Sequence, residues 1–171
     1  MSMKKNWWKY LCIVLLFYTI IAGFLGPIPQ LNILEESIRN LYFHVPMWFS
    51  MMAMMLVSLV FSIRYLSKQK ITDDIVAASF AKVGFIFGLL GVITGSVWAR
   101  ATWGAWWVFA EVKLNGAGAA LLVYAAYFIL RGSFDDEEKK ARFSAVYSIF
   151  AFVMFMVLIN VIPRISNSSL H

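Results

Sequence analysis

Hydrophobic residues in this chain gather into five blocks, which short polar or charged stretches separate. Most blocks approach the ~20 apolar residues that one helix needs to cross a hydrocarbon core ~30 Å thick. The pattern predicts an all-α fold, a polytopic membrane helical bundle, within a single integral-membrane domain over residues 1–171. The five predicted transmembrane helices cover residues 7–26, 45–63, 80–98, 114–130 and 143–162. The fourth is the shortest.

The composition supports a membrane protein. Hydrophobic residues make up 61% of the chain and charged residues 14%, against about 45–50% and about 25% in soluble globular proteins. The first block exceeds the ~7–15 apolar residues of a signal peptide, and no small-x-small cleavage site precedes Pro27, so we expect a retained anchor. The single cysteine, Cys12, lies in this block and is expected to behave as a small hydrophobic residue.

The basic residues predict the orientation of the helices. Eleven of the fifteen Lys and Arg residues flank the blocks on the side that holds the N-terminus. Cytoplasmic loops carry the excess of positive charge, so the N-terminus is expected to be cytoplasmic. The outer segments are then two loops, 27–44 and 99–113, and a tail, 163–171. These flanks account for the net charge of +6, so nucleic-acid binding is not needed to explain it.

Tryptophan residues concentrate in one outer segment. Four of the seven lie between Trp98 and Trp107, with Gly104 among them and Arg100 beside them. Tryptophan favours the membrane interface, where one part of the side chain is apolar and another is wet. An anchoring belt needs only one or two, so the cluster indicates a flat aromatic surface for a flat, mostly apolar ligand that carries a few charges. A simple belt is the alternative.

The two histidines of the chain, His44 and His171, both fall on the predicted outer side. Pro46 suits the first turn of a helix, so His44 is expected just before that turn. Two imidazoles that face each other across an aromatic surface can hold haem iron as axial ligands. The alternatives are a hydrogen-bonding rim residue for His44 and a chain end without a role for His171.

Two other patterns favour packing over chemistry. Met51, Met52, Met54 and Met55 occupy several faces of the second block, so a core role is preferred to a metal relay. Small residues recur every three or four positions along the third block, at Gly84, Gly88, Gly91 and Gly95, which favours close helix packing in lipid. The sequence holds no phosphate loop and no zinc-ligand spacing, so no catalytic residue and no enzyme activity are predicted.

Three segments resemble the haem-handling family of cytochrome c maturation that includes haem exporter protein C (CcmC), CcmF and CcsA. Residues 95–107 resemble the tryptophan-rich signature of that family, the WWD motif. Residues 42–46, with Trp48 shortly after, resemble its first histidine motif, Tyr-x-His-Val-Pro. Residues 167–171 resemble its second histidine motif. The three matches follow the family's order along the chain.

The resemblance implies a haem-transfer role at the outer, periplasmic face of the bacterial cytoplasmic (inner) membrane. Members hold haem b as transient cargo and pass it to the haem chaperone CcmE, beside the CcmAB ABC transporter and CcmD. His44 and His171 would then be the axial iron ligands, and Arg100 would pair with a haem propionate. The haem-contacting set that the resemblance implies is Trp98, Arg100, Trp103, Gly104, Trp106, Trp107 and Phe109.

The chain departs from the family pattern in two ways. Phe109 and Ala110 stand where the family has Trp and Asp, and Glu111 is expected to supply the carboxylate one position later. The family also has six crossings, so a further helix is expected beyond His171. Two other functions stay open. They are a haem lyase or synthetase subunit, and a structural subunit of a membrane complex that binds no haem.

Overall fold

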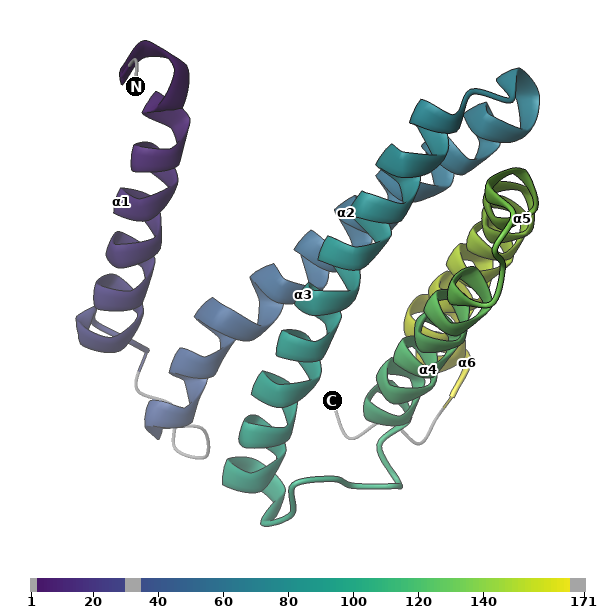
Figure 1. Ribbon diagram of the computed structural model, residues 1–171. Helices are drawn as coiled ribbons and strands as arrows, with labels where there is room; N and C mark the ends of the chain where they lie inside the picture. Colours follow the sequence, from purple (N-terminus) through teal and green to yellow (C-terminus); the bar gives the residue numbers. More distant parts are fainter. Residues whose placement is uncertain (1–2, 30–34, 167–171) are drawn as a thin grey trace.

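The structure, a computed structural model, describes residues 3–29 and 35–166, and these ranges contain helices but no strand (Figure 1). The all-α prediction is confirmed for this part of the chain. In chain order, the elements are α1 (Met3–Leu25), the 3-10 helix η1 (Glu35–Asn40), α2 (Leu41–Lys68), α3 (Ile71–Trp103), α4 (Val112–Gly132), α5 (Glu137–Met156), the π-helix η2 (Val157–Val161) and α6 (Ile162–Ile165).

Five helical segments of the described chain are long and apolar enough to cross a membrane, as predicted. They cover Asn6–Leu25, Glu36–Lys68, Ile71–Trp103, Val112–Gly132 and Glu137–Ile165. The second and third are much longer than the predicted blocks 45–63 and 80–98. The predicted blocks end where polar residues lower the hydropathy. The helices continue past these residues, because polar side chains at a helix end can contact water or a buried polar partner.

The core lies between α2, α3, α4 and α5. Its fully buried residues include Met51 and Met55 of α2, Tyr124 of α4 and Phe155 of α5. On α3, a Cβ atom at Gly84 would lie 3.0 Å from Met55 Cε, and one at Gly88 would lie 2.6 Å from Met51 Sδ. The packing role that the sequence predicted is therefore confirmed for these two methionines, which sit against the glycines of α3.

Helix α1 stands apart from the other helices along most of its length (Figure 1). It is held at its C-terminal end, where the rings of Phe24 and Phe43 lie 5.0 Å apart. Arg39 of η1 also donates from Nη1 to the carbonyl oxygens of Gly23 and Gly26, at 3.2 and 2.7 Å. Most side chains along α1 are exposed, as suits a helix that faces lipid.

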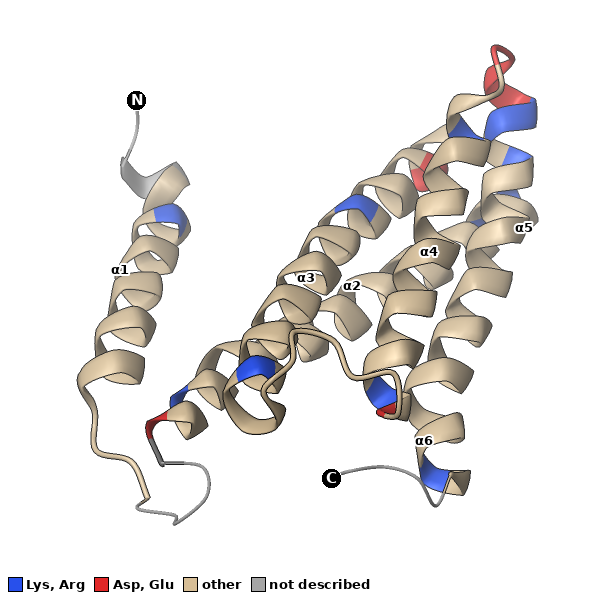
Figure 2. Cartoon of the chain, turned by 90° about the horizontal axis from the view of Figure 1, so that it is seen from below, with Lys and Arg blue, Asp and Glu red and all other residues tan. Residues whose placement is uncertain are grey.

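The connections group at two ends of the bundle (Figures 1 and 2). The start of α1, the α2–α3 turn and the α4–α5 turn lie at one end. Element η1, the α3–α4 loop and α6 lie at the other, which we call the outer end. The assignment of this end to the periplasm remains a prediction from the basic residues.

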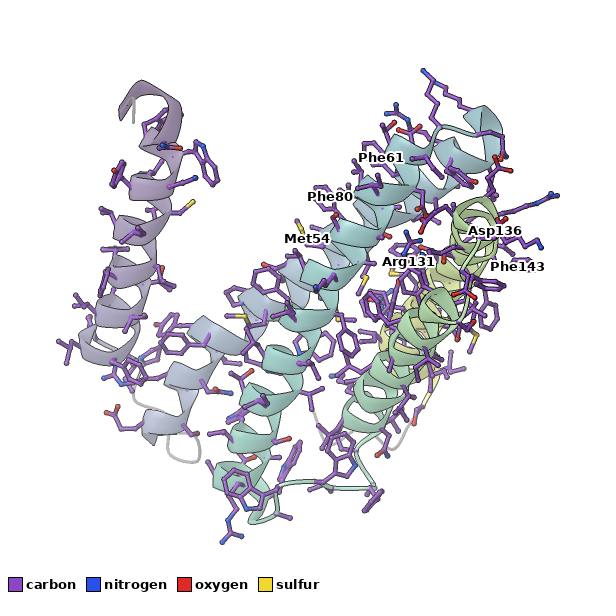
Figure 3. The ribbon with its side chains drawn as sticks, in the orientation of Figure 1. Met54, Phe61, Phe80, Arg131, Asp136 and Phe143 are labelled. Atoms are coloured by element: carbon purple, nitrogen blue, oxygen red, sulfur yellow. The ribbon has the colours of Figure 1, made fainter. Side chains whose placement is uncertain are left out.

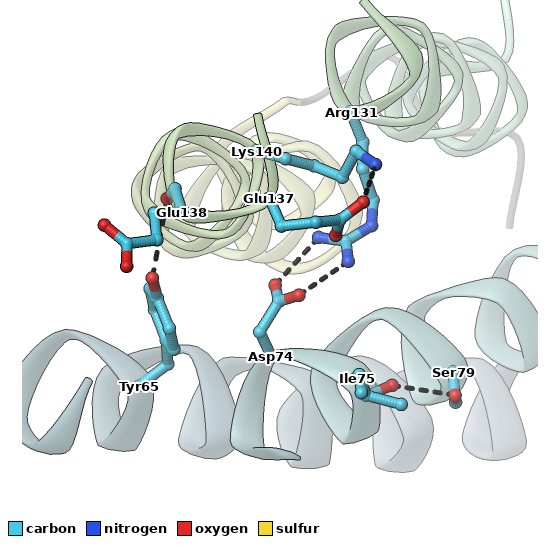
Figure 4. Close-up of polar contacts among 8 residues, drawn as sticks. All are labelled: Tyr65, Asp74, Ile75, Ser79, Arg131, Glu137, Glu138 and Lys140. Carbon is cyan, nitrogen blue, oxygen red and sulfur yellow. Dashed lines mark hydrogen bonds and ion pairs between the residues drawn. The ribbon is translucent and has the colours of Figure 1, made fainter. Parts of the chain in front are cut away.

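A buried ion pair joins α3 to α4 at the opposite, inner end. Arg131 Nη1 and Nη2 donate to Asp74 Oδ1 and Oδ2 at 2.7 and 2.6 Å (Figure 4). Figure 3 places Arg131 between the two helices. The side chains are 19% and 5% exposed. Arg64 Nη2 lies 3.5 Å from Asp73 Oδ1 in the same region. Hydropathy alone did not predict these ion pairs, because a charged residue in the sequence looks like the end of a hydrophobic block.

Replacement of Asp74 by Asn should therefore destabilise the bundle. The change leaves the Arg131 guanidinium half-buried without its counter-charge, which costs about 3–5 kcal/mol for a buried pair. Denaturant unfolding in detergent micelles measures the loss. Glu36→Gln is the matched control, because it breaks an ion pair with Arg39 in which the Glu36 side chain is 70% exposed. The control should cost at most about 1 kcal/mol. Equal losses for the two variants would contradict the assignment.

Candidate functional site

A cavity of about 400 Å³ opens between α2, α3 and α4 near the outer end. Ligand-binding pockets in proteins typically enclose about 300–1,000 Å³. Its wall is mostly apolar and aromatic, with a few polar groups. The lining includes His44 and Trp48 from α2, Trp98 and Trp103 from α3, and Glu111 and Lys113 from the start of α4. The site therefore gathers residues from two predicted outer loops that are about 60 positions apart in the sequence.

His44 lies inside α2, in its first turn. The prediction that it precedes the helix is wrong, because η1 leads directly into α2 and the helix begins at Leu41, before Pro46. Pro46 has no N–H to give to the carbonyl of Tyr42, four residues earlier, yet the helix continues through it. The imidazole is thus carried by a regular helix and not by a loop.

The surroundings of His44 fix the plane of its ring. Its Nδ1 lies 3.1 Å from Thr94 Oγ1 of α3. Trp48, one helical turn further along α2, meets the imidazole edge to face, with ring centroids 6.2 Å apart and an interplanar angle of 74°. A Cβ atom at Gly95 would lie 2.9 Å from His44 Cε1, and one at Gly91 would lie 3.0 Å from Trp48 Cε2. These two glycines make room for the two rings.

The small-residue stripe of α3 thus has two uses. Gly84 and Gly88 face the core methionines of α2, as a packing stripe should. Gly91 and Gly95 face the rings of Trp48 and His44 and line the cavity. The sequence reading assigned all four to helix packing and so missed the second use. The spacing could not separate the two uses, because both pairs are four residues apart on one helix face.

Helix α3 extends through Trp103, so the loop to α4 covers only residues 104–111 and not the predicted 99–113. Gly104 ends the helix with a φ of +77°, and its N–H donates to the Arg100 carbonyl at 3.2 Å. This left-handed conformation favours glycine at the position that follows a helix. Arg100 and Trp103 therefore belong to the helix and not to the loop, whereas Trp98 lies in the helix as predicted.

The remaining aromatic residues of the predicted set lie in different places. Trp107 Nε1 donates to Asn115 Oδ1 at 3.0 Å, and the indole packs where a Cβ of Gly118 would stand. Trp106 and Phe109 are 61% and 83% exposed and do not line the cavity. The predicted aromatic set is therefore divided into cavity residues, a residue that attaches the loop to α4, and an exposed pair at the outer surface.

Charged groups lie on both sides of the aromatic residues. Arg100 is exposed, and its Nη1 donates to the Gly104 carbonyl. Lys113 lines the cavity. Glu111 is 1% exposed and caps α4, where its Oε1 accepts from the Lys113 backbone N–H at 3.1 Å. The sequence predicted Glu111 only as a displaced carboxylate and predicted no role for Lys113.

The donor set suits a metal that arrives with ligands of its own. Among the described residues that line the cavity, His44 is the histidine. The second histidine of the chain, His171, lies outside the described residues. Within residues 3–29 and 35–166, no group of three or more His, Cys, Asp or Glu side chains could hold a metal ion. One imidazole beside indole rings fits a metalloporphyrin, because the porphyrin supplies four nitrogen ligands and a flat apolar face.

Comparison with known proteins gives a consistent assignment. The family model described as Heme exporter protein C matches residues 1–163. Similar proteins, each named Heme exporter protein C, occur in several bacteria. The relative from Escherichia coli K12 is 26% identical over 123 residues, which is 72% of this chain and 50% of the relative. The relative from Paracoccus denitrificans is 25% identical over 152 residues, which is 89% of this chain and 61% of the relative.

A third relative, from Bradyrhizobium diazoefficiens, is 29% identical over 114 residues, which is 66% of this chain and 43% of the relative. The chain therefore spans about half the length of the curated relatives that it matches. The family model covers nearly all of the chain and includes two of the three segments of resemblance, residues 42–46 and 95–107. This multi-pass membrane protein belongs to the Heme exporter protein C family.

Proposed function

We propose that this chain binds haem during c-type cytochrome biogenesis, holds it at the periplasmic face of the inner membrane and delivers it to the chaperone CcmE. The observation that carries the proposal is the position of His44 in a cavity walled by Trp98 and Trp103. Haem b would be cargo that is taken up and released unchanged, so the chain is proposed as a transfer protein and not as an enzyme. CcmAB and CcmD are the proposed partners in the membrane.

His44 and His171 are the proposed axial ligands of the iron. The π-helix η2, which precedes α6 along the chain, contributes Ile159 to the cavity wall. π-helical turns inside α-helices often occur at functional sites.

The porphyrin is proposed to lie with its apolar face against Trp98 and Trp103, while the exposed pair, Trp106 and Phe109, covers its outward side or meets CcmE. Both members of this pair are more than half exposed, so they can contact a partner without rearrangement of the bundle. Two other residues support this arrangement. Trp107 attaches the α3–α4 loop to α4, and Gly104 ends α3 and begins the loop.

Lys113 and Arg100 are the proposed partners of the haem propionates. Lys113 lines the cavity and Arg100 is exposed in the last turn of α3, so the propionates would point toward water at the outer end. Charge-assisted hydrogen bonds of this kind are about twice as strong as neutral ones.

His44→Ala should abolish most haem binding, because it removes the ligand carried by α2. Absorption spectra of the purified, haem-reconstituted chain measure the loss, and His171→Ala should shift the spectrum to that of a singly ligated iron. Trp7→Ala is the control, since Trp7 is 63% exposed on α1 and far along the chain from the site. A wild-type chain that takes up no haem, or an unchanged His44→Ala spectrum, would favour a structural subunit that binds no haem.

Gly95→Ala should weaken haem binding about tenfold or more, because the added methyl group displaces the His44 ring from its position. Gly84→Ala is the matched control on the same helix face. The added Cβ meets Met55 Cε at 3.0 Å and Met54 Cβ at 3.1 Å, neither of which lines the cavity, so it should change the haem dissociation constant by less than about twofold. Equal effects of the two variants in a haem titration would mean that the ring position does not matter.

Lys113→Gln should weaken haem binding about tenfold, since a hydrogen bond to a charged group contributes about 1.5–3 kcal/mol. Arg100→Gln should have a smaller effect, because Arg100 is exposed. The control ligand is haem dimethyl ester, whose propionates carry no charge. The variants and the wild type should bind this ester equally. A loss that persists with the ester would contradict propionate pairing.

A further inference from the structure

Thr94 of α3 makes three close polar contacts through one hydroxyl oxygen. Its Oγ1 lies 2.8 Å from the Leu90 carbonyl oxygen and 3.0 Å from the Gly91 carbonyl oxygen, both on the preceding turn. The same oxygen lies 3.1 Å from His44 Nδ1. The residue belongs neither to the histidine motif nor to the tryptophan-rich motif. Its backbone carbonyl also accepts from Asn40 Nδ2 at 2.9 Å, which ties the start of α2 to the same point.

The direction of each hydrogen bond follows from the chemistry of the groups. A carbonyl oxygen can only accept, whereas a hydroxyl has one proton to donate and two lone pairs. When that proton is directed at the carbonyls of Leu90 and Gly91, the lone pairs of Oγ1 are left for the imidazole. His44 Nδ1 must then be the donor. The other tautomer would force the hydroxyl to turn away from both carbonyls and would leave Nδ1 as the acceptor.

We propose that Thr94 is a positioning residue that holds His44 in the tautomer with the proton on Nδ1, so that the lone pair on Nε2 is directed to haem iron. The iron half of this statement rests on the proposed function, whereas the tautomer half does not. Histidines that bind metals almost always donate their other ring N–H to a neighbouring acceptor, which fixes the tautomer and the ring orientation. Here the acceptor is a hydroxyl that the α3 backbone orients.

Gly95, the next residue along α3, supports the same role. The absence of a side chain there lets His44 Cε1, the carbon between the two ring nitrogens, come close to the α3 backbone. Thr94 and Gly95 together therefore set the distance, the orientation and the protonated nitrogen of the ring. The neighbouring helix supplies all three constraints, so they exist before any ligand binds.

Nitrogen NMR of the haem-free chain tests the tautomer directly. The chain has two histidines, so a His171→Ala background labelled with ¹⁵N-histidine reports His44 alone, at a pH where imidazole is neutral. We expect a protonated Nδ1 and an unprotonated Nε2. Thr94→Val keeps the shape of the side chain but removes the acceptor, and it should lose this preference. Thr94→Ser restores the hydroxyl and should restore the preference.

Haem titration of the same Thr94 substitutions in the otherwise unchanged chain supplies the second measurement. Thr94→Val should raise the haem dissociation constant about 10–100-fold, which is the usual effect of losing the partner of a ligating histidine. Thr94→Ser should stay within about threefold of wild type. The matched control is Thr102→Val, two helical turns further along α3, which removes a hydroxyl that donates to the Trp98 carbonyl at 2.8 Å. Circular dichroism confirms that each variant folds.

Two outcomes separate the inference from the proposed function. If haem binds but Thr94→Val leaves both the tautomer and the dissociation constant unchanged, the positioning role is overturned and the function stands. If the wild-type chain binds no haem but Thr94→Val still changes the tautomer, the hydrogen bond is supported and the haem function fails.

Discussion

The absence of side chains along one face of α3 determines how α2 lies against it, and the rest of the structure depends on that contact. Toward the inner end, Gly84 and Gly88 admit Met55 and Met51 to the core. Toward the outer end, the same stripe continues as Gly91 and Gly95 and admits the rings that form the cavity wall. The same row of glycines on α3 therefore allows close packing in the core and leaves room for the rings at the site. A helix with larger residues on this face would push α2 away and would separate His44 from Thr94.

The five helices of the described residues that are long and apolar enough to cross a membrane could be predicted from the sequence, because each gives a long apolar block. The ends of the helices could not. Asp74 and Arg131 look like block boundaries in a hydropathy profile, but in the fold they lie inside helices and form a buried pair. Pro46 suggested a helix start, yet the helix begins five residues earlier, since the 3-10 turn before it already sets the direction of the chain.

The residues of the site were predictable in kind but not in arrangement. The tryptophan cluster is continuous in the sequence, whereas α3 ends within it at Trp103, so the later tryptophans follow a different path. Trp103 lines the cavity and Trp106 is exposed, although only three positions separate them. Thr94 and Lys113 were missed because neither is unusual for its place in the sequence. Only the fold brings one beside His44 and the other into the cavity wall.

This division suits a protein that must release what it binds. Under the proposed function, a rigid inner wall carries one ligand whose orientation is set in advance, and preorganisation of that kind reduces the cost of binding. The exposed pair, Trp106 and Phe109, lies on the loop outside the cavity. Haem held in this way would be bound firmly on one side and accessible on the other, which is the geometry that a transfer to a second protein requires.

The most direct test is a crystal structure of the haem-loaded chain with anomalous diffraction recorded at the iron absorption edge. The account predicts one iron peak in the cavity between α2, α3 and α4, at bonding distance from His44 Nε2, with Nδ1 still facing Thr94. An iron peak away from the cavity, or one bonded to Nδ1, would contradict it.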